Sequence, residues 1–399
     1  MGLLRFPSTS ALKHCRNRAP VSLGAWIVGG RPLKMTNKFA GLAFGLVLTA
    51  TSALAQDDGP PRPVLPPLAL DAQMTNAQIG AALDPWLAGL HRDGVLNGVF
   101  LVARDGREIF ARSYGSVDAA QSAAVNLDTR FALASIGKAF THVAVAQLIQ
   151  EGRLTPETTI ADVLPDYPNA VTRTATVQQL LTHQAGVADI FGPAFRETPK
   201  ASLDNNRAYY ALVSAQPPMF APGAGEEYCN GCYVVLGEII AAITGQSYES
   251  YVREHVFAPA SMTSSEFLRY DQAPPTTARY SGRPMGPDSP LQDVSRFHGV
   301  AGSAAGNVYS TARDMLAFDN ALREHRLLNS EMTAQVLRSE PQTARATARV
   351  GFAGGSPGVN TLLFGNGAWT VIVLTNFDEP AGETIGAAVF PLLAGPRPQ

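Results

Sequence analysis

The sequence has few charged residues, and their charges nearly cancel. Asp, Glu, Lys and Arg make up 16% of the 399 residues, with 31 basic and 33 acidic side chains and a formal net charge of −2. A nucleic-acid-binding protein should show a basic excess, and a disordered chain should be poor in apolar residues, whereas 46% of this chain is apolar. With 36 Gly and 29 Pro residues, the composition predicts a compact, turn-rich globular protein without a nucleic-acid partner.

The sequence also lacks an apolar run long enough to span a membrane. The apolar run Phe39 to Ala50 is shorter than the roughly 20 residues that a transmembrane helix needs. It follows Lys38 and precedes Ala53-Leu54-Ala55, the order of a secretory signal. No cysteine follows this site to accept a lipid. We therefore expect cleavage before Gln56 and export to the periplasm or the medium, without a stable membrane anchor.

The expected signal peptide covers residues 35–55 and has a positively charged stretch before it. Residues 1–34 are either an unusually long start of the signal or an upstream extension ahead of a true start at Met35, and we favour the extension. Residues 56–70 contain five prolines and predict an extended tether. The remaining residues, 71–399, are expected to form the functional domain.

Local patterns along this domain predict an α+β fold. Apolar residues at helical spacing follow Asn76, and Asp105-Gly106 and Gly365-Asn366-Gly367 are typical of hairpin turns between strands. A closing helix is expected over Glu383 to Leu393. The pattern predicts an antiparallel sheet flanked by helices, built from about residues 71–134 and 290–399, with a mostly helical insertion over about 135–289.

Cysteine is scarce, and no metal or cofactor is expected. Loss of Cys15 in processing would leave Cys229 and Cys232 as the only thiols. Their spacing allows a disulfide in an oxidising compartment, and two unpaired small apolar residues remain equally open. A thioredoxin-like role is disfavoured because no βαβ pattern surrounds the pair. The seven histidines show no paired metal-binding spacing.

Lysine is scarce as well, which draws attention to the segment before the helical run Ala139 to Gln150. After Ala55 the chain has only Lys138 and Lys200. Ser135 lies three residues before Lys138, a spacing that places both side chains on one helical face. A serine needs a nearby base to act as a nucleophile, and a lysine with a lowered pKa can be that base. A serine at a helix start also gains backbone N–H groups that favour an oxyanion.

A second candidate segment contains Tyr228 and Asn230, two residues apart and just ahead of the helical run Val234 to Ile243. Their side chains can point to the same side of extended backbone. A phenol there can pass a proton to a leaving group, and an amide can orient an acyl chain.

Five segments of the chain together form an ordered set of motifs. They are Phe131 to Lys138, Leu180 to Gly186, Tyr228-Cys229-Asn230, Gly302 to Asp314 and Gly354 to Gly358. Taken in this order, they resemble the serine β-lactamases and penicillin-binding-protein-like hydrolases, especially class C β-lactamases, family VIII carboxylesterases and D-amino-acid peptidases. The resemblance implies a β-lactamase-like, DD-peptidase-like fold in which Ser135 is acylated, Lys138 is its base, Tyr228 shares protons with both and Asn230 contacts the substrate amide.

The third motif of this family departs from the usual pattern. Where relatives have K-T-G or H-x-G, this sequence has Phe352-Ala353-Gly354. The resemblance implies that Phe352, Gly354 and Gly355 belong to the substrate-binding site, although a phenyl ring cannot hold a carboxylate. The N–H of Gly355 can still form an oxyanion hole with that of Ser135. The resemblance therefore implies a serine hydrolase for neutral ester or amide substrates, small molecules or peptides, with weak use of penicillins. The alternative is a catalytically silent member that binds cell-wall peptides or acts as a scaffold.

His183 and Asp314 in these segments are expected to be structural. His183 ends a helix before a glycine turn, and Thr311 with Asp314 fits a helix-capping box. The segment from Arg338 to Arg349 looks shorter than the strand pair that precedes the third motif in the family.

Overall fold

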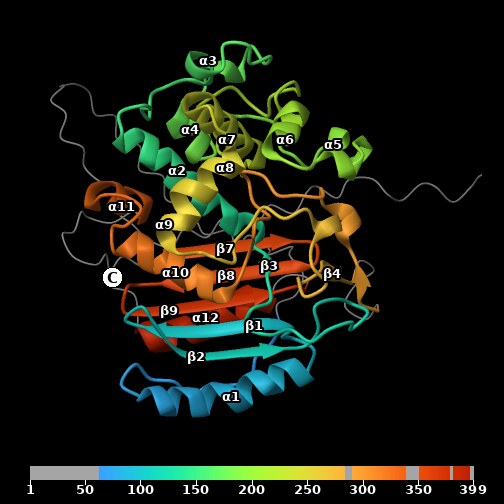
Figure 1. Cartoon of the computed structure of the whole chain (residues 1–399), viewed down its shortest axis with the longest axis vertical. Helices are drawn as coiled ribbons and strands as arrows, with labels where there is room; N and C mark the ends of the chain where they lie inside the picture. The colour runs from blue at the N-terminus through green and yellow to red at the C-terminus, as the bar shows by residue number, and fades with distance from the viewer. Residues whose placement is uncertain (1–62, 284–289, 338–349, 378–380, 396–399) are drawn as a thin grey trace, which may run out of the picture.

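The computed structural model describes residues 63–283, 290–337, 350–377 and 381–395. The predicted extension, the signal peptide, the first part of the tether and the segment from Arg338 to Arg349 lie outside these residues. The described chain has the predicted α+β fold, in which helices cover an antiparallel sheet (Figure 1).

The central sheet joins the two ends of the domain. Its five strands run in the order β2-β1-β9-β8-β7, and every neighbouring pair is antiparallel. Strand β1 pairs with β9 in a register that places Gly98 opposite Thr375. Both predicted hairpins are present, β1–β2 and β8–β9. The strands are β1 (Gly98–Arg104), β2 (Arg107–Tyr114), β7 (Val350–Ser356), β8 (Val359–Gly365) and β9 (Trp369–Thr375).

The two faces of the sheet pack against different helices. Helices α1 (Asn76–Arg92) and α12 (Ala381–Ala394) cover one face, where their buried residues share a core with Phe100 and Val102 of β1. The alternate residues Val99 and Leu101 face the other side and join the core of the helical part. Because successive strand residues point to opposite faces, one apolar strand serves two cores.

The chain between β2 and β7 is mostly helical. Its central pair is α2 (Lys138–Gln150) and α7 (Asn230–Thr244), which pack against each other. The other helices are α3 (Ile160–Val163), α4 (Val177–Leu181), α5 (Pro193–Glu197), α6 (Asn206–Val213), α8 (Tyr248–Val252), α9 (Ala258–Ala260), α10 (Ala312–Arg323) and α11 (Ser330–Leu337). The helices around α2 and α7 lie beyond strand β7, whereas α10 lies over a face of the sheet, against β9 and β1 (Figure 1). The short strand pairs are β3 (Phe131–Ala132) with β6 (Tyr309–Ser310), and β4 (Ser281–Gly282) with β5 (Gln292–Asp293).

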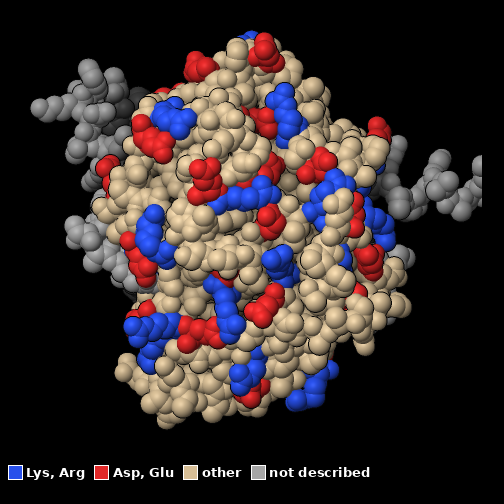
Figure 2. All heavy atoms as spheres, in the orientation of Figure 1, with Lys and Arg blue, Asp and Glu red and all other residues tan. Residues whose placement is uncertain are grey.

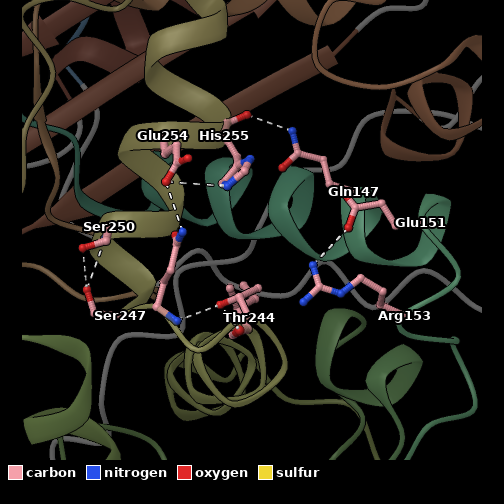
Figure 3. Close-up of polar contacts among 10 residues, drawn as sticks. Gln147, Glu151, Arg153, Thr244, Ser247, Ser250, Glu254 and His255 are labelled. Atoms are coloured by element: carbon pink, nitrogen blue, oxygen red, sulfur yellow. Dashed lines mark hydrogen bonds and ion pairs between the residues drawn. The ribbon is translucent and has the colours of Figure 1, made fainter.

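Polar contacts fix the end of α2 that is remote from Ser135 (Figure 3). The Gln147 side chain donates to the carbonyl of His255, in the helical turn after α8, at 2.9 Å and to that of Leu327 at 3.2 Å. Arg153, just past the helix, contacts Glu151 and the Ile243 carbonyl at the end of α7. These contacts hold α2 at its C-terminal end.

The prediction of an unpacked tether is wrong for its last residues. Leu65 and Leu68 pack against the core under α1, Leu70 is buried within it, and the Trp86 indole donates to the Pro66 carbonyl at 3.0 Å. Prolines favour extended backbone, but Leu65 between two prolines and Leu68 and Leu70 after the last one supply apolar surface that packs in the core with α1.

The surface view shows acidic and basic side chains interspersed, without a large area of one sign on this face (Figure 2). Several of these charges form ion pairs, such as Arg313 with Glu108 at 2.9 Å. Within the described ranges, no helix is long and apolar enough to cross a membrane.

Candidate active site

Ser135 lies at the junction of the sheet and the helical part. It belongs to a 3₁₀ turn, η1 (Ala134–Gly137), that leads directly into α2. The sequence predicted Ser135 at the start of the α-helix, and the structure places it in the 3₁₀ turn that directly precedes this helix. Ala134, just before it, has a φ of 45°, a left-handed conformation that non-glycine residues rarely adopt. Such local strain is common at functional sites because it aims a side chain away from the regular backbone.

Two glycines allow other segments to approach the backbone around Ser135. A Cβ atom at Gly354 of β7 would lie 2.2 Å from the Leu133 carbonyl oxygen and 3.0 Å from the Ser135 nitrogen. A Cβ atom at Gly306 would lie 2.3 Å from the Ala134 carbonyl oxygen. Any side chain at either position would push the serine turn away, so both residues act through the closeness of their backbone.

Lys138 begins α2, and its amine is buried beside the serine. Its Nζ atom lies 3.2 Å from Oγ of Ser135, and it donates to the Asn230 side-chain oxygen and to the Ala305 carbonyl, both at 2.7 Å. Burial lowers the pKa of Lys138 to about 7, and the negative charge of Asp189 opposes this shift. The lysine can therefore lose its proton near neutral pH, as a general base must.

Tyr228 completes a chain of polar groups with Ser135 and Lys138. Its hydroxyl donates to Oγ of Ser135 at 2.7 Å, and its ring centre lies 4.8 Å from the lysine nitrogen. His183 packs against this ring with a centroid distance of 4.9 Å, and its Nδ1 accepts the N–H of Cys229 at 3.2 Å. His183 thus holds the segment that carries Tyr228, in agreement with its predicted structural role.

Asn230, the first residue of α7, links the lysine to a carboxylate that sequence analysis missed. Its side-chain oxygen accepts from Lys138, and its side-chain nitrogen and backbone N–H donate to Asp189 at 3.0 and 2.9 Å. Asp189 lies three residues beyond the resemblance segment that ends at Gly186, and that proximity was the available signal. Sequence analysis missed the Ala305 carbonyl because every residue type has a backbone carbonyl that can accept a hydrogen bond.

A cavity of about 330 Å³ opens beside the serine. Its wall combines Ser135, Tyr228 and Asn230 with apolar side chains that include Phe191, Phe195 and Met219. The described lining contains no lysine or arginine, and its acidic members are Asp189 and Glu227. The electrostatic environment of the cavity therefore disfavours an anionic ligand.

The third motif is divided between the cavity and the core. Gly355 lines the cavity with Ser135, and Gly354 supplies the close approach of β7. Phe352, predicted to bind substrate, is not among the lining residues and packs its ring against Phe318 of α10 at a centroid distance of 6.5 Å. An aromatic side chain gains more from this apolar contact than from exposure to a polar site.

The remaining sequence predictions concern stability. Cys229 and Cys232 form a disulfide, with Cα atoms 5.3 Å apart, so the pairing that the sequence left open is present. Thr311 caps α10 by accepting the N–H of Asp314. The Asp314 carboxylate does not complete a capping box, because it accepts from the backbone N–H of Ser264 and the hydroxyl of Ser265.

A serine beside a buried lysine and a tyrosine, at the edge of an antiparallel sheet and under a helical part, defines the penicillin-binding-protein-like class of serine hydrolases. The beta-lactamase family profile matches residues 70–385. The chain belongs to the beta-lactamase family.

Two similar proteins come from Bacillus species and one from Streptomyces. The putative penicillin-binding protein PbpX of Bacillus subtilis is 29% identical over 237 residues, 59% of this chain and 57% of that protein. The chain thus matches a little over half the length of PbpX. A penicillin-binding protein from Bacillus halodurans has a TM-score of 0.66 and 26% identity, covering 75% of this chain and 98% of the other. A D-stereospecific amidohydrolase from Streptomyces has a TM-score of 0.61 and 24% identity, and the match covers 79% of this chain and 99% of the amidohydrolase.

Proposed function

We propose that the protein is an exported hydrolase that cleaves neutral esters or amides through an acyl-enzyme on Ser135, which water then releases. The observation that carries the proposal is the arrangement of one serine oxygen between two proton-handling groups, 3.2 Å from the Lys138 nitrogen and 2.7 Å from the Tyr228 hydroxyl. A nucleophile with a base in reach is the minimum that acyl transfer needs.

In acylation, the neutral amine of Lys138 takes the serine proton while Oγ attacks the substrate carbonyl carbon. The bond to the leaving group then breaks, and the leaving alkoxide or amine receives a proton through the Tyr228 hydroxyl, which is replenished from Lys138. Water attacks the acyl-enzyme in the second step, its proton passes to the same groups, and the carboxylic acid leaves as Ser135 is restored. In both steps the oxyanion would accept hydrogen bonds from the N–H groups of Ser135 and Gly355, two residues that line the cavity.

The preference for neutral substrates rests on charge. Relatives with a cation in the third motif can hold a substrate carboxylate, whereas Phe352 cannot, and the described cavity lining offers no arginine or lysine in its place. Asp189 and Glu227 would repel a carboxylate. The apolar wall around Phe191 and Phe195 matches an alkyl or aryl acyl group.

The proposal is tested by comparing two chromogenic substrates, a short p-nitrophenyl ester and a cephalosporin, with protein that begins at Gln56. We expect turnover of the ester that disappears in Ser135→Ala, and much slower turnover of the cephalosporin. Faster cephalosporin turnover would overturn the neutral-substrate assignment. If Ser135→Ala retains both activities, the serine mechanism is overturned. No turnover of either substrate, or of longer acyl esters, would favour the silent binding protein.

Export is part of the same proposal and has a separate test. Its support is the signal-like order from Lys38 to Ala55 and the naming of relatives as penicillin-binding proteins. Mass spectrometry of the natively produced protein should find Gln56 at the N-terminus in the extracytoplasmic fraction. A protein that keeps residues before 56 and stays in the cytoplasm would contradict export.

A further inference from the structure

The Asp189 carboxylate lies at the junction of the catalytic groups and the cavity wall. One of its oxygens accepts both the backbone and the side-chain N–H of Asn230, at 2.9 and 3.0 Å. Its other oxygen accepts the N–H of Phe191 at 3.0 Å. Asp189 therefore connects the first residue of α7 to the loop that carries an aromatic wall of the cavity.

The partners of Asn230 determine which way its amide points. As an ammonium, Lys138 offers only N–H donors, so it requires the oxygen of the amide, and a carboxylate at Asp189 offers only acceptors, so it requires the nitrogen. A flipped amide would place donor against donor and acceptor against acceptor. The carboxylate thus selects the orientation in which Asn230 presents an acceptor to the lysine.

This orientation determines where the lysine lone pair points. A neutral amine has two N–H bonds, and Lys138 has two fixed acceptors at 2.7 Å, the Asn230 oxygen and the Ala305 carbonyl. With both hydrogens used, the lone pair faces the third neighbour, Oγ of Ser135 at 3.2 Å. Without the Asn230 acceptor, the amine could rotate away from the serine.

We infer that Asp189 is a positioning residue: it orients the Asn230 amide and thereby directs the lone pair of Lys138 at Ser135. The inference rests on the proposed function for the use of Lys138 as a base. Asp189 itself touches neither the serine nor the lysine through a hydrogen bond, and it acts through Asn230.

The carboxylate also affects the charge of the lysine. The titratable groups around Lys138 are Asp189 from the cavity loop, Tyr228 and Tyr233, whose ring centres lie 4.8 and 5.5 Å from Nζ, and His183 packed on both rings. Asp189 is the group whose charge raises the pKa of Lys138 against the effect of burial. Removal of this charge should therefore lower the pKa of the lysine further.

The scarcity of lysine permits a direct measurement. Protein that begins at Gln56 contains only Lys138 and Lys200, so ¹³C-labelled lysine gives two ε-carbon signals, which Lys200→Arg assigns. We expect the Lys138 midpoint near pH 7 in the unmutated protein and about one pH unit lower in Asp189→Asn. Glu226→Gln, which removes a charge two residues before Tyr228 outside the cavity lining, should leave the midpoint unchanged.

Kinetics on the ester supply the second readout. Asp189→Asn retains an oxygen that can accept from Asn230, so kcat above pH 7 should fall by less than about tenfold, while the acid limb of kcat/KM moves to lower pH with the lysine. Asp189→Ala removes the acceptor, and kcat should fall about 100-fold. If kcat is higher in Asp189→Asn than in Asp189→Ala, the fall of kcat in Asp189→Ala is due to the lost orientation of the Asn230 amide.

Two results would overturn the inference. One is equal kcat in Asp189→Ala and the unmutated protein, and the other is an equal fall of kcat in Asp189→Asn and Asp189→Ala. Either result would leave the proposed function intact as long as Ser135→Ala abolishes turnover. If the unmutated protein fails to hydrolyse the ester, the Lys138 midpoint of Asp189→Ala decides the inference. It should lie below that of Asp189→Asn, because the Asn230 oxygen is no longer held toward the ammonium, and equal midpoints would overturn the inference. If circular dichroism shows that Asp189→Ala does not fold, Asp189→Leu, which also removes the acceptor, takes its place.

Discussion

The hydroxyl of Tyr228 donates a hydrogen bond of 2.7 Å to Oγ of Ser135, across 93 residues of sequence. Ser135 lies just before α2, and Tyr228 lies just before α7. These two helices pack against each other, so their N-terminal ends meet at the cavity. The catalytic contact is thus a consequence of one helix pairing.

Removal of this hydroxyl should slow the reaction without weakening substrate binding. Tyr228→Phe keeps the ring against His183 but removes the group that passes the proton to the leaving group. We expect kcat on the ester to fall about 100- to 1000-fold, with little change in KM. Tyr251→Phe, which removes a phenol hydroxyl on α8 away from the cavity, is the matched control. Equal kcat in the two variants would contradict the role of Tyr228.

The rate should depend on the protonation of Lys138. Burial lowers its pKa to about 7, and only the neutral amine accepts the serine proton. The ammonium form predominates below that pH, so kcat/KM should rise through about pH 7 and level off above it. A flat profile between about pH 5 and about pH 9 would contradict a lysine base.

A guanidinium cannot replace this amine. Lys138→Arg keeps the positive charge but stays protonated at any working pH, so ester hydrolysis should fall at least about 1000-fold. Lys200→Arg is the matched control, because Lys200 donates to the carbonyls of Phe195 and Thr198 and an arginine can do the same. Retained activity in Lys138→Arg would assign the base elsewhere.

Local sequence signals predicted much of the fold and part of the site. The turns at Asp105-Gly106 and Gly365-Asn366-Gly367 determine their hairpins within a few residues, and both are confirmed. The spacing of Ser135 and Lys138 is equally local. In contrast, Asp189 reaches Asn230 across 41 residues, through a loop whose path depends on the packed helices. No local pattern encodes such a contact.

The local sequence also could not predict the backbone conformation around Ser135 or the direction of the Phe352 side chain. The left-handed φ of Ala134 is unusual for alanine and depends on the segments packed around it. The packing of Phe352 on Phe318 depends on where α10 crosses the sheet. The family resemblance located the third motif but could not tell which of its residues face the cavity.

The absence of a side chain at Gly354 should be essential for catalysis. In Gly354→Ala the new methyl group would overlap the Leu133 carbonyl and crowd the Ser135 nitrogen, which displaces the serine turn. We expect the free energy of unfolding to fall by about 1–3 kcal/mol and kcat to fall by about 100-fold or more. Gly89→Ala in α1, with 3.8 Å to its nearest neighbouring atom, is the control and should keep full activity. An active Gly354→Ala variant would show that β7 can move away without cost.

A cation in the third motif should shift the substrate preference. Phe352 packs on Phe318 and not in the cavity wall, but the lysine of Phe352→Lys has a long flexible stem. Its ammonium can leave the apolar contact and extend toward the cavity, where it can attract the carboxylate of a β-lactam. We expect the ratio of cephalosporin to ester turnover to rise at least about tenfold, as one favourable charge contact provides, with some loss of stability because the ring leaves Phe318. Phe352→Met, which keeps an apolar side chain, controls for the lost ring. No gain in cephalosporin turnover by a folded Phe352→Lys variant would count against the charge argument.

The disulfide between Cys229 and Cys232 should support catalysis as well as stability, because Cys229 lies between Tyr228 and Asn230. Thiol counting on unreduced protein that begins at Gln56 should find no free thiol, and two free thiols would exclude the bridge. The double variant Cys229→Ser, Cys232→Ser should lose about 2 kcal/mol of unfolding free energy. Its kcat on the ester should also fall several-fold, since the segment that enters α7 gains freedom at Tyr228 and Asn230, which contact Ser135 and Lys138. If kcat is unchanged at a temperature where the variant is fully folded, the bridge serves stability alone, and the contacts of His183 and Asp189 are sufficient to position this turn.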